Sequence, residues 1–129
     1  MELFFSNKTN CASCHGGFNF TNYSFENNGL DSVYADNGRF RLTNNPNDEA
    51  LFKVPSLRNV GLTAPFMHDG RFSTLEEVIE HYNSGGENHQ NKSSYIRPLQ
   101  LTMEEKTELV AFLNSLTDYE FINDSKWKK

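Results

Sequence analysis

The chain has 129 residues, of which 36% are hydrophobic and 22% charged, and this length suits a single domain. Its 12 Lys and Arg residues against 17 Asp and Glu residues give a net charge of -5, so nucleic acid is excluded as an expected partner because no basic patch neutralises phosphates. No stretch approaches the roughly 20 apolar residues of a membrane-spanning helix, and membrane insertion is therefore not expected.

The first predicted element is a short helix. Leu3, Phe4 and Phe5 form its end, and it leads into a pentapeptide with the one-letter sequence CASCH at residues 11–15. Gly16 and Gly17 then end the turn. We therefore expect the pentapeptide to lie directly beside an N-terminal helix.

Both cysteines of the chain, Cys11 and Cys14, belong to this pentapeptide. A zinc ribbon is not expected, because structural zinc takes ligands from two clusters and the other histidines lack the spacing for a second one. A thioredoxin-type pair should follow a strand in an alternating strand and helix pattern, which the flanking sequence does not offer. Cys-x-x-Cys-His is the attachment signature of c-type haem, in which both sulfurs form thioethers and the imidazole binds iron. Covalent haem is thus the favoured interpretation, and a thiol redox pair is the alternative.

The next segment, from Phe18 to Asn47, is rich in Asn and Gly and has few periodic apolar positions. It predicts a long ordered loop with room for one short hairpin. A loop of this length needs a body to wrap around. A buried haem would also supply apolar core that a small polar chain, with a mean hydropathy of -0.67, lacks.

Two later helices are marked by capping boxes, in which a Thr at the N-cap is followed three residues later by a Glu. Thr74 and Glu77 open the first helix, which ends before Gly85. Thr102 and Glu105 open the second, which runs to about residue 116. Its apolar positions follow the i, i+3, i+4, i+7 pattern of an amphipathic helix: Leu109, Phe112, Leu113 and Leu116.

These elements predict an all-α, loop-rich fold in which residues 1–129 form one domain like a class I cytochrome c. In that arrangement the first and last helices cross, and the helices and loops pack around one covalently bound haem. Several phenylalanines are candidates for the core or for packing on the haem: Phe4, Phe5, Phe18, Phe52, Phe66, Phe72 and Phe112.

The middle of the chain carries longer motifs: FKVPSLRNV at 52–60, LTAPFMHDGRF at 62–72 and TLEEV at 74–78. They resemble the C-terminal haem domain of the bacterial di-haem cytochrome c peroxidases and their relatives, which include the methylamine dehydrogenase maturases. The resemblance also takes in residues 3–5 before CASCH and the closing segment 101–117. It therefore extends over nearly the whole chain.

The resemblance implies two haems on two domains. In such proteins the N-terminal domain holds the peroxidatic haem, and the C-terminal domain holds a six-coordinate haem that passes electrons to it. With one Cys-x-x-Cys-His motif, this chain resembles the electron-transferring half, so we do not expect peroxidase activity from it alone. The expected partners are the N-terminal peroxidatic domain and a small electron-donor protein, and a homodimer could form. The alternative is a free-standing mono-haem electron carrier.

Haem is attached to this motif outside the bacterial inner membrane, so we expect a periplasmic or otherwise exported protein. A signal peptide has a basic segment followed by a long apolar run, and the first five residues contain neither. We therefore expect the sequence to be a fragment of a longer di-haem protein.

The expected haem-binding residues are Cys11 and Cys14 for the thioethers and His15 as the proximal iron ligand. Arg58 and Asn59 are expected to bind the haem propionates, because a guanidinium offers two parallel charge-assisted donors to a carboxylate. A plain surface arginine is the alternative for Arg58.

The resemblance also implies that Thr63 and Pro65 correspond to positions whose backbone carbonyls help to hold calcium between two haem domains. Carbonyl oxygens suit this hard cation. With the other domain absent, we expect the calcium site to be incomplete.

The distal iron ligand is expected to be Tyr82. In the peroxidases that this chain resembles, a methionine occupies the position that corresponds to Tyr82, counted from the proline equivalent to Pro65. The maturase relatives have a tyrosine at that position, and it ligates their haem. Met67 is the main alternative, because a loop thioether is the usual sixth ligand of simple cytochromes c. Weaker alternatives are Met103, which more simply covers core in the last helix, and two histidines, His68 and His81. His89 is expected to face solvent.

Overall fold

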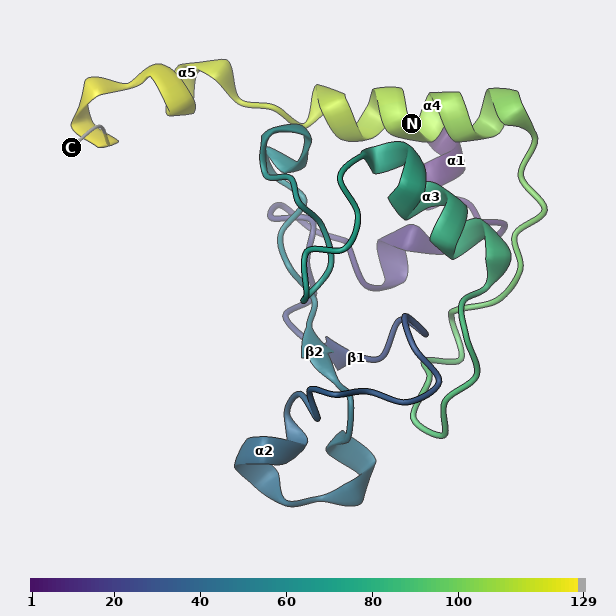
Figure 1. Cartoon of the computed structure of the whole chain (residues 1–129). Helices are drawn as coiled ribbons and strands as arrows, with labels where there is room; N and C mark the ends of the chain where they lie inside the picture. Colours follow the sequence, from purple (N-terminus) through teal and green to yellow (C-terminus); the bar gives the residue numbers. More distant parts are fainter. Residues whose placement is uncertain (128–129) are drawn as a thin grey trace.

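The computed structural model describes residues 1–127 (Figure 1). Its helices are α1 (Glu2–Phe5), α2 (Phe40–Thr43), α3 (Leu75–Ser84), α4 (Met103–Ser115) and α5 (Tyr119–Asn123). Its strands are β1 (Phe25–Glu26) and β2 (Phe52–Lys53). Helix α4 packs against both α3 and α1, so the N-terminal helix and the long C-terminal helix meet as expected.

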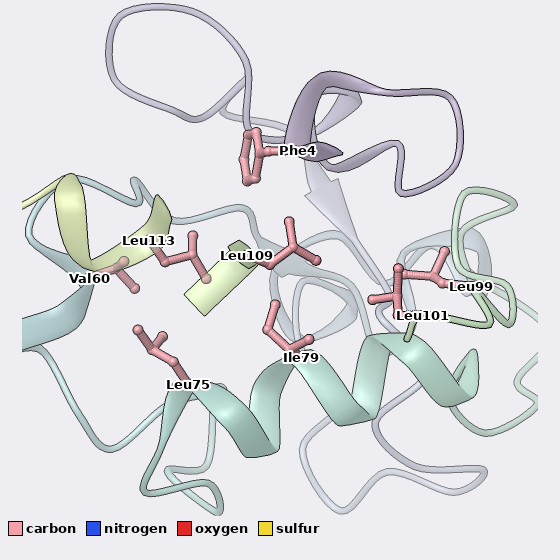
Figure 2. Close-up of a cluster of buried hydrophobic side chains, with 8 residues drawn as sticks. All are labelled: Phe4, Val60, Leu75, Ile79, Leu99, Leu101, Leu109 and Leu113. Carbon is pink, nitrogen blue, oxygen red and sulfur yellow. The ribbon is translucent and has the colours of Figure 1, made fainter. Parts of the chain in front are cut away.

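The hydrophobic core lies between these three helices (Figure 2). Side chains from α3 and α4 point toward one another in the close-up, and Phe4 of α1 approaches them from the other side. The buried residues of the core are Phe4, Val60, Leu75, Ile79, Leu99, Leu101, Leu109 and Leu113. The apolar pattern predicted for α4 therefore forms one wall of the core.

Both predicted capping boxes are present. In α3 the Glu77 amide donates to Thr74 Oγ1 at 3.2 Å, and the Thr74 amide donates to Glu77 Oε2 at 3.0 Å. In α4 the Glu105 and Thr102 amides make the same pair of bonds, at 3.2 Å and 2.8 Å. Helix α3 ends at Gly85, whose φ of 84° favours glycine because a side chain is strained there.

The predicted loop from residue 18 to residue 47 contains α2 and β1. Strand β1 pairs antiparallel with β2, with Phe25 opposite Lys53. The all-α prediction is therefore confirmed only in part: the packed elements around the core are helices, and a two-stranded sheet is added. Two-residue strands are too short to produce an alternating pattern in the sequence.

Three side chains that the sequence offered for the core lie outside it. Met103 is 76% exposed, because the first position of α4 faces solvent there. Phe18 is 82% exposed, and the Arg58 guanidinium lies 4.1 Å from the centre of its ring. Phe5 is 51% exposed, although its ring makes an edge contact with Phe112. The apolar character of these side chains did not by itself indicate which face they occupy.

The C-terminal helix α5 projects beyond the end of α4, away from the core (Figure 1). Its N-cap, Asp118, is linked to the body of the domain, because the Asp118 amide donates to Asn59 Oδ1 at 2.7 Å. Within residues 1–127, no helix is both long and apolar enough to cross a membrane.

Candidate functional site

The pentapeptide CASCH folds as a tight helical turn immediately after α1. The amides of Cys14 and His15 both donate to the Cys11 carbonyl, at 3.3 Å and 2.9 Å. Asn10 precedes the turn with a left-handed backbone, which asparagine tolerates better than most residues. The turn therefore places two sulfurs and one imidazole within a single loop of backbone.

His15 is oriented by a backbone acceptor. Its Nδ1 lies 3.0 Å from the Phe20 carbonyl oxygen, which can only accept, so Nδ1 carries the proton and Nε2 keeps its lone pair. Burial lowers the pKa of His15, and the bond to Phe20 opposes this only in part. The neutral imidazole is the form that binds a metal ion.

The two thiols lie in surroundings that suppress thiolate formation. Burial raises the pKa of Cys11. Burial, together with the nearby Glu26 carboxylate and Cys11, raises the pKa of Cys14 to about 11. Reactive thiol pairs of the Cys-x-x-Cys type have lowered pKa values. This environment therefore weighs against the redox-pair alternative.

The turn opens onto a cavity of about 390 Å³ with a mainly apolar lining. Cys11, Cys14 and His15 belong to the lining, together with residues of α1, α3 and α4. Most of the buried core residues also line it, with Leu101 outside. Much of the hydrophobic core is thus the wall of this cavity.

The cavity fits the group that the sequence implies. A flat apolar macrocycle needs an apolar cleft, two sulfurs at one edge and an imidazole nitrogen for its metal. The cavity lining provides all three from residues 11–15 and the three core helices. Cys11, Cys14 and His15 would attach and ligate a haem here.

Two of the expected distal ligands, Met67 and Tyr82, line the cavity, and His68 does so as well. The His68 ring is stacked on Phe52 with a centroid distance of 3.8 Å. Within the described chain, Met103 and His81 lie outside the lining. The structure therefore brings Met67 and Tyr82 to the same cavity as His15.

Asn28, which sequence reasoning missed, lies among these distal candidates. Its Nδ2 donates to Met67 Sδ at 3.3 Å. Its carbonyl oxygen lies 3.0 Å from Nε2 of His81, the residue before Tyr82 in α3. Burial raises the pKa of Tyr82, and the interaction with Asn28 opposes that rise.

His89 is half-buried, so the expectation that it faces solvent is wrong. Its Nδ1 lies 3.2 Å from Nδ2 of Asn27, which is fully buried. Asn27 Oδ1 in turn accepts from the Tyr34 hydroxyl at 3.1 Å and from the Gly29 amide at 2.8 Å. This network fixes the backbone on either side of Asn28.

The residues expected to bind propionates and calcium lie outside the cavity lining within the described chain. Arg58 Nε donates to the Phe18 carbonyl at 2.9 Å, and Asn59 Oδ1 accepts from a backbone amide. Thr63 and Pro65 are exposed on the loop before α3. These assignments stay predictions.

Two cationic side chains that the sequence did not single out do line the cavity. Lys53 comes from β2, and Arg97 comes from the segment between α3 and α4. Arg97 Nη2 donates to the Asn7 carbonyl at 2.8 Å, which places its guanidinium beside the approach to CASCH. Either cation has the charge that a propionate requires.

Comparison with known proteins shows the family to which the chain belongs. The family profile described as "Cytochrome c" matches residues 2–117. The chain is 39% identical over 115 residues to the methylamine utilization protein MauG of Methylorubrum extorquens. The aligned region covers 87% of this chain and 32% of that protein. It is 38% identical over 125 residues to the cytochrome c peroxidase Ccp of Escherichia coli, covering 89% of this chain and 24% of that protein. The chain thus spans a third or less of the length of these two relatives.

A solved structure has the same fold over almost the whole chain. The crystal structure of a MauG-like protein associated with microbial copper homeostasis superposes with a TM-score of 0.91 and 36% identity. It covers 98% of this chain, and this chain covers 48% of it. The di-haem peroxidase BthA of Burkholderia thailandensis shares the fold at a TM-score of 0.72 and 23% identity.

Fold and site together define a domain that binds c-type haem. The matched profile covers nearly all of the chain, and the attachment motif lies on the cavity that the core helices enclose. The chain belongs to the cytochrome c family, and it is homologous to haem domains of the MauG proteins and the cytochrome c peroxidases.

Proposed function

We propose that this chain is the electron-transferring haem domain of a di-haem protein of the peroxidase and MauG type. One haem c would be attached through Cys11 and Cys14, with His15 as the proximal ligand. When bound, haem c supplies a one-electron couple between ferric and ferrous iron. The observation that carries the proposal is the cavity that contains CASCH and Tyr82 in one lining.

The residues of the chain would perform three tasks in this function. His15 would present Nε2 to the iron, because Nδ1 is held by the Phe20 carbonyl. The core residues of α3 and α4 would exclude water from the cavity, which protects a buried redox centre from solvent. Tyr82, on α3, would fill the sixth iron position and leave peroxide no open place to bind.

A free-standing electron carrier is the second candidate, and one observation favours it. Met67 lines the same cavity as Tyr82, and its sulfur accepts a hydrogen bond from Asn28, which also lines the cavity. Thioether ligation raises the reduction potential of cytochromes c, whereas a hard anionic phenolate favours ferric iron. The distal ligand therefore separates the two candidate functions.

The whole protein would be exported to the periplasm and would contain a second, peroxidatic haem on a further domain. A small electron-donor protein would reduce it, and a homodimer could form. The exposed carbonyls of Thr63 and Pro65 would contribute to a calcium site only with oxygen ligands from that further domain. The two relatives are longer than this chain, which leaves room for such a domain.

The test is to purify the chain after export in a host that attaches haem c. A spectroscopic redox titration should show one reversible one-electron couple, and steady-state turnover of hydrogen peroxide should stay below ~1 per second, at the low end of enzyme rates. Peroxide turnover above that rate would contradict the assignment of this chain to the electron-transferring half. The double variant Cys11→Ala with Cys14→Ala, expressed in the same host, is the matched control, because it keeps His15 but can form neither thioether.

A further inference from the structure

We propose that Asn28 is a positioning residue that holds the Met67 sulfur away from the sixth iron position and leaves that position to Tyr82. The inference rests on the proposed haem site and deepens it, because it names what selects between the two distal candidates. Neither the attachment motif nor the apolar cavity makes that selection.

The first argument is the contact itself. Asn28 Nδ2 donates to Met67 Sδ at 3.3 Å, and Asn28, Met67 and Tyr82 all line the cavity. An amide nitrogen has two protons, so a donor proton remains when one is used for the sulfur. To ligate iron, the sulfur must exchange this hydrogen bond for the bond to the metal, whereas the Tyr82 hydroxyl keeps acceptor capacity for a donor.

The second argument is that Asn28 is fixed relative to α3, the helix that carries Tyr82. The Asn28 carbonyl lies 3.0 Å from Nε2 of His81, the residue before Tyr82. The next carbonyl, of Gly29, accepts from the Glu87 amide at 2.7 Å, just beyond the end of α3. On the other side, the fully buried Asn27 is bonded to His89. These bonds fix the backbone at Asn28 beside α3.

The third argument concerns the loop that carries Met67. Met67 has a φ of 73°, a left-handed conformation that costs a residue with a side chain and persists where the surroundings hold it. The loop is closed by the Phe66 amide, which donates to the Phe72 carbonyl at 2.7 Å. Arg71 connects this loop to the Asn28 segment, since its Nη1 donates to Asp31 Oδ1 at 2.9 Å. Met67 is thus retained beside Asn28.

The experiment uses the haem-loaded chain and replaces Asn28 by Ala. Loss of one neutral hydrogen bond should shift the ratio of tyrosine-ligated to methionine-ligated haem by about two- to tenfold toward methionine. The readouts are the near-infrared methionine-to-iron band of the ferric protein and the reduction potential, which should rise with methionine ligation. Asn45→Ala is the matched control, because Asn45 caps a short turn outside the cavity lining.

A double variant isolates the mechanism. In Asn28→Ala combined with Met67→Leu, the methionine band and the rise in potential should both be absent. Asn28→Leu, which keeps the branched shape of the side chain but cannot donate, should behave as Asn28→Ala does and guards against a folding defect in one variant. Circular dichroism of each variant checks that the helices are retained.

The outcomes separate this inference from the function on which it rests. Tyr82→Phe with Asn28 intact tests the distal ligand alone, and an unchanged ferric spectrum there overturns the Tyr82 assignment. If Tyr82→Phe does change the spectrum while both Asn28 variants keep the parent ligand ratio and potential, the role of Asn28 is overturned and the haem site stands.

Discussion

The imidazole Nδ1 of His15 lies 3.0 Å from the carbonyl oxygen of Phe20, five residues further along the chain. This contact fixes the tautomer of a ring that the attachment motif alone leaves free to rotate. A short backbone turn therefore prepares the nitrogen that would bind iron, before any group occupies the cavity.

The first prediction is that Cys11 and Cys14 each form a thioether when the chain is exported in a haem-attaching host. The denatured protein should keep its haem, as shown by a pyridine haemochrome spectrum and by the intact mass. Replacing both cysteines by Ser should abolish covalent haem, and either single replacement should leave one linkage. An unmodified mass with two titratable thiols in the parent protein would rule out the haem site.

The second prediction concerns the sixth iron position. Tyr82→Phe should convert the six-coordinate ferric spectrum to a five-coordinate one, because phenylalanine retains the ring but has no oxygen to bind the metal. Met67→Leu is the control and should leave the ferric spectrum as it is. The reverse pair of results, with the spectrum changed by Met67→Leu and not by Tyr82→Phe, assigns the position to Met67 and favours the electron carrier.

The third prediction uses two leucines that differ in their relation to the cavity. Leu101 belongs to the buried core and lies outside the lining. Leu101→Ala should therefore lower the free energy of unfolding by about 2–5 kcal/mol, with or without haem. Leu57 is half-buried and lines the cavity, so Leu57→Ala should lower the free energy of unfolding more in the haem-loaded protein than in the haem-free protein. Denaturant unfolding of both forms measures the difference. If Leu57→Ala lowered the free energy of unfolding equally in the two forms, the haem would not pack against this lining.

The fourth prediction is a pH dependence from the α3 capping box. Hydrogen bonds from the Ser73 and Thr74 amides lower the pKa of Glu77 below 4.5. A lowered pKa in the folded state means that the unfolded chain binds the proton more readily, so this stabilisation is present above pH 4.5 and is lost as the pH falls through the folded-state value. Glu77→Gln should therefore weaken the fall in stability on acidification, measured by unfolding at a series of pH values. Glu76→Gln, which removes the neighbouring carboxylate of the same turn, is the control and should keep the parent dependence.

The parts of this protein that the sequence predicts are local. The contacts of each capping box join residues three apart, and those within the CASCH turn join residues three or four apart, so their patterns are visible in a short stretch of sequence. The long motifs at 52–78 carried the family resemblance, and the similarity to MauG and cytochrome c peroxidase sequences confirms it. What these patterns could not provide was the position of an exposed apolar residue such as Phe18, because either face of a loop accepts it.

The residues that the sequence did not indicate are brought to the site by long-range contacts. Asn28 and Met67 are 39 residues apart, and each is an ordinary residue in a loop until the fold places them together. The same holds for His89, whose ring contacts the Asn27 side chain although the two residues are 62 positions apart in the sequence. Lys53 and Arg97 likewise reach the cavity from separate segments of the chain.

The sequence by itself determined the attachment chemistry, because a thioether pair and its adjacent imidazole depend on covalent spacing within five residues. It also determined where α3 and α4 begin, because caps satisfy backbone amides within one turn of helix. Only the tertiary structure decided which side chains share the cavity with His15 and that Asn28 donates to Met67 while its carbonyl contacts His81 in α3. The reason is physical: such contacts form when loops far apart in the chain close over a common core, and their geometry is fixed by packing and not by local spacing.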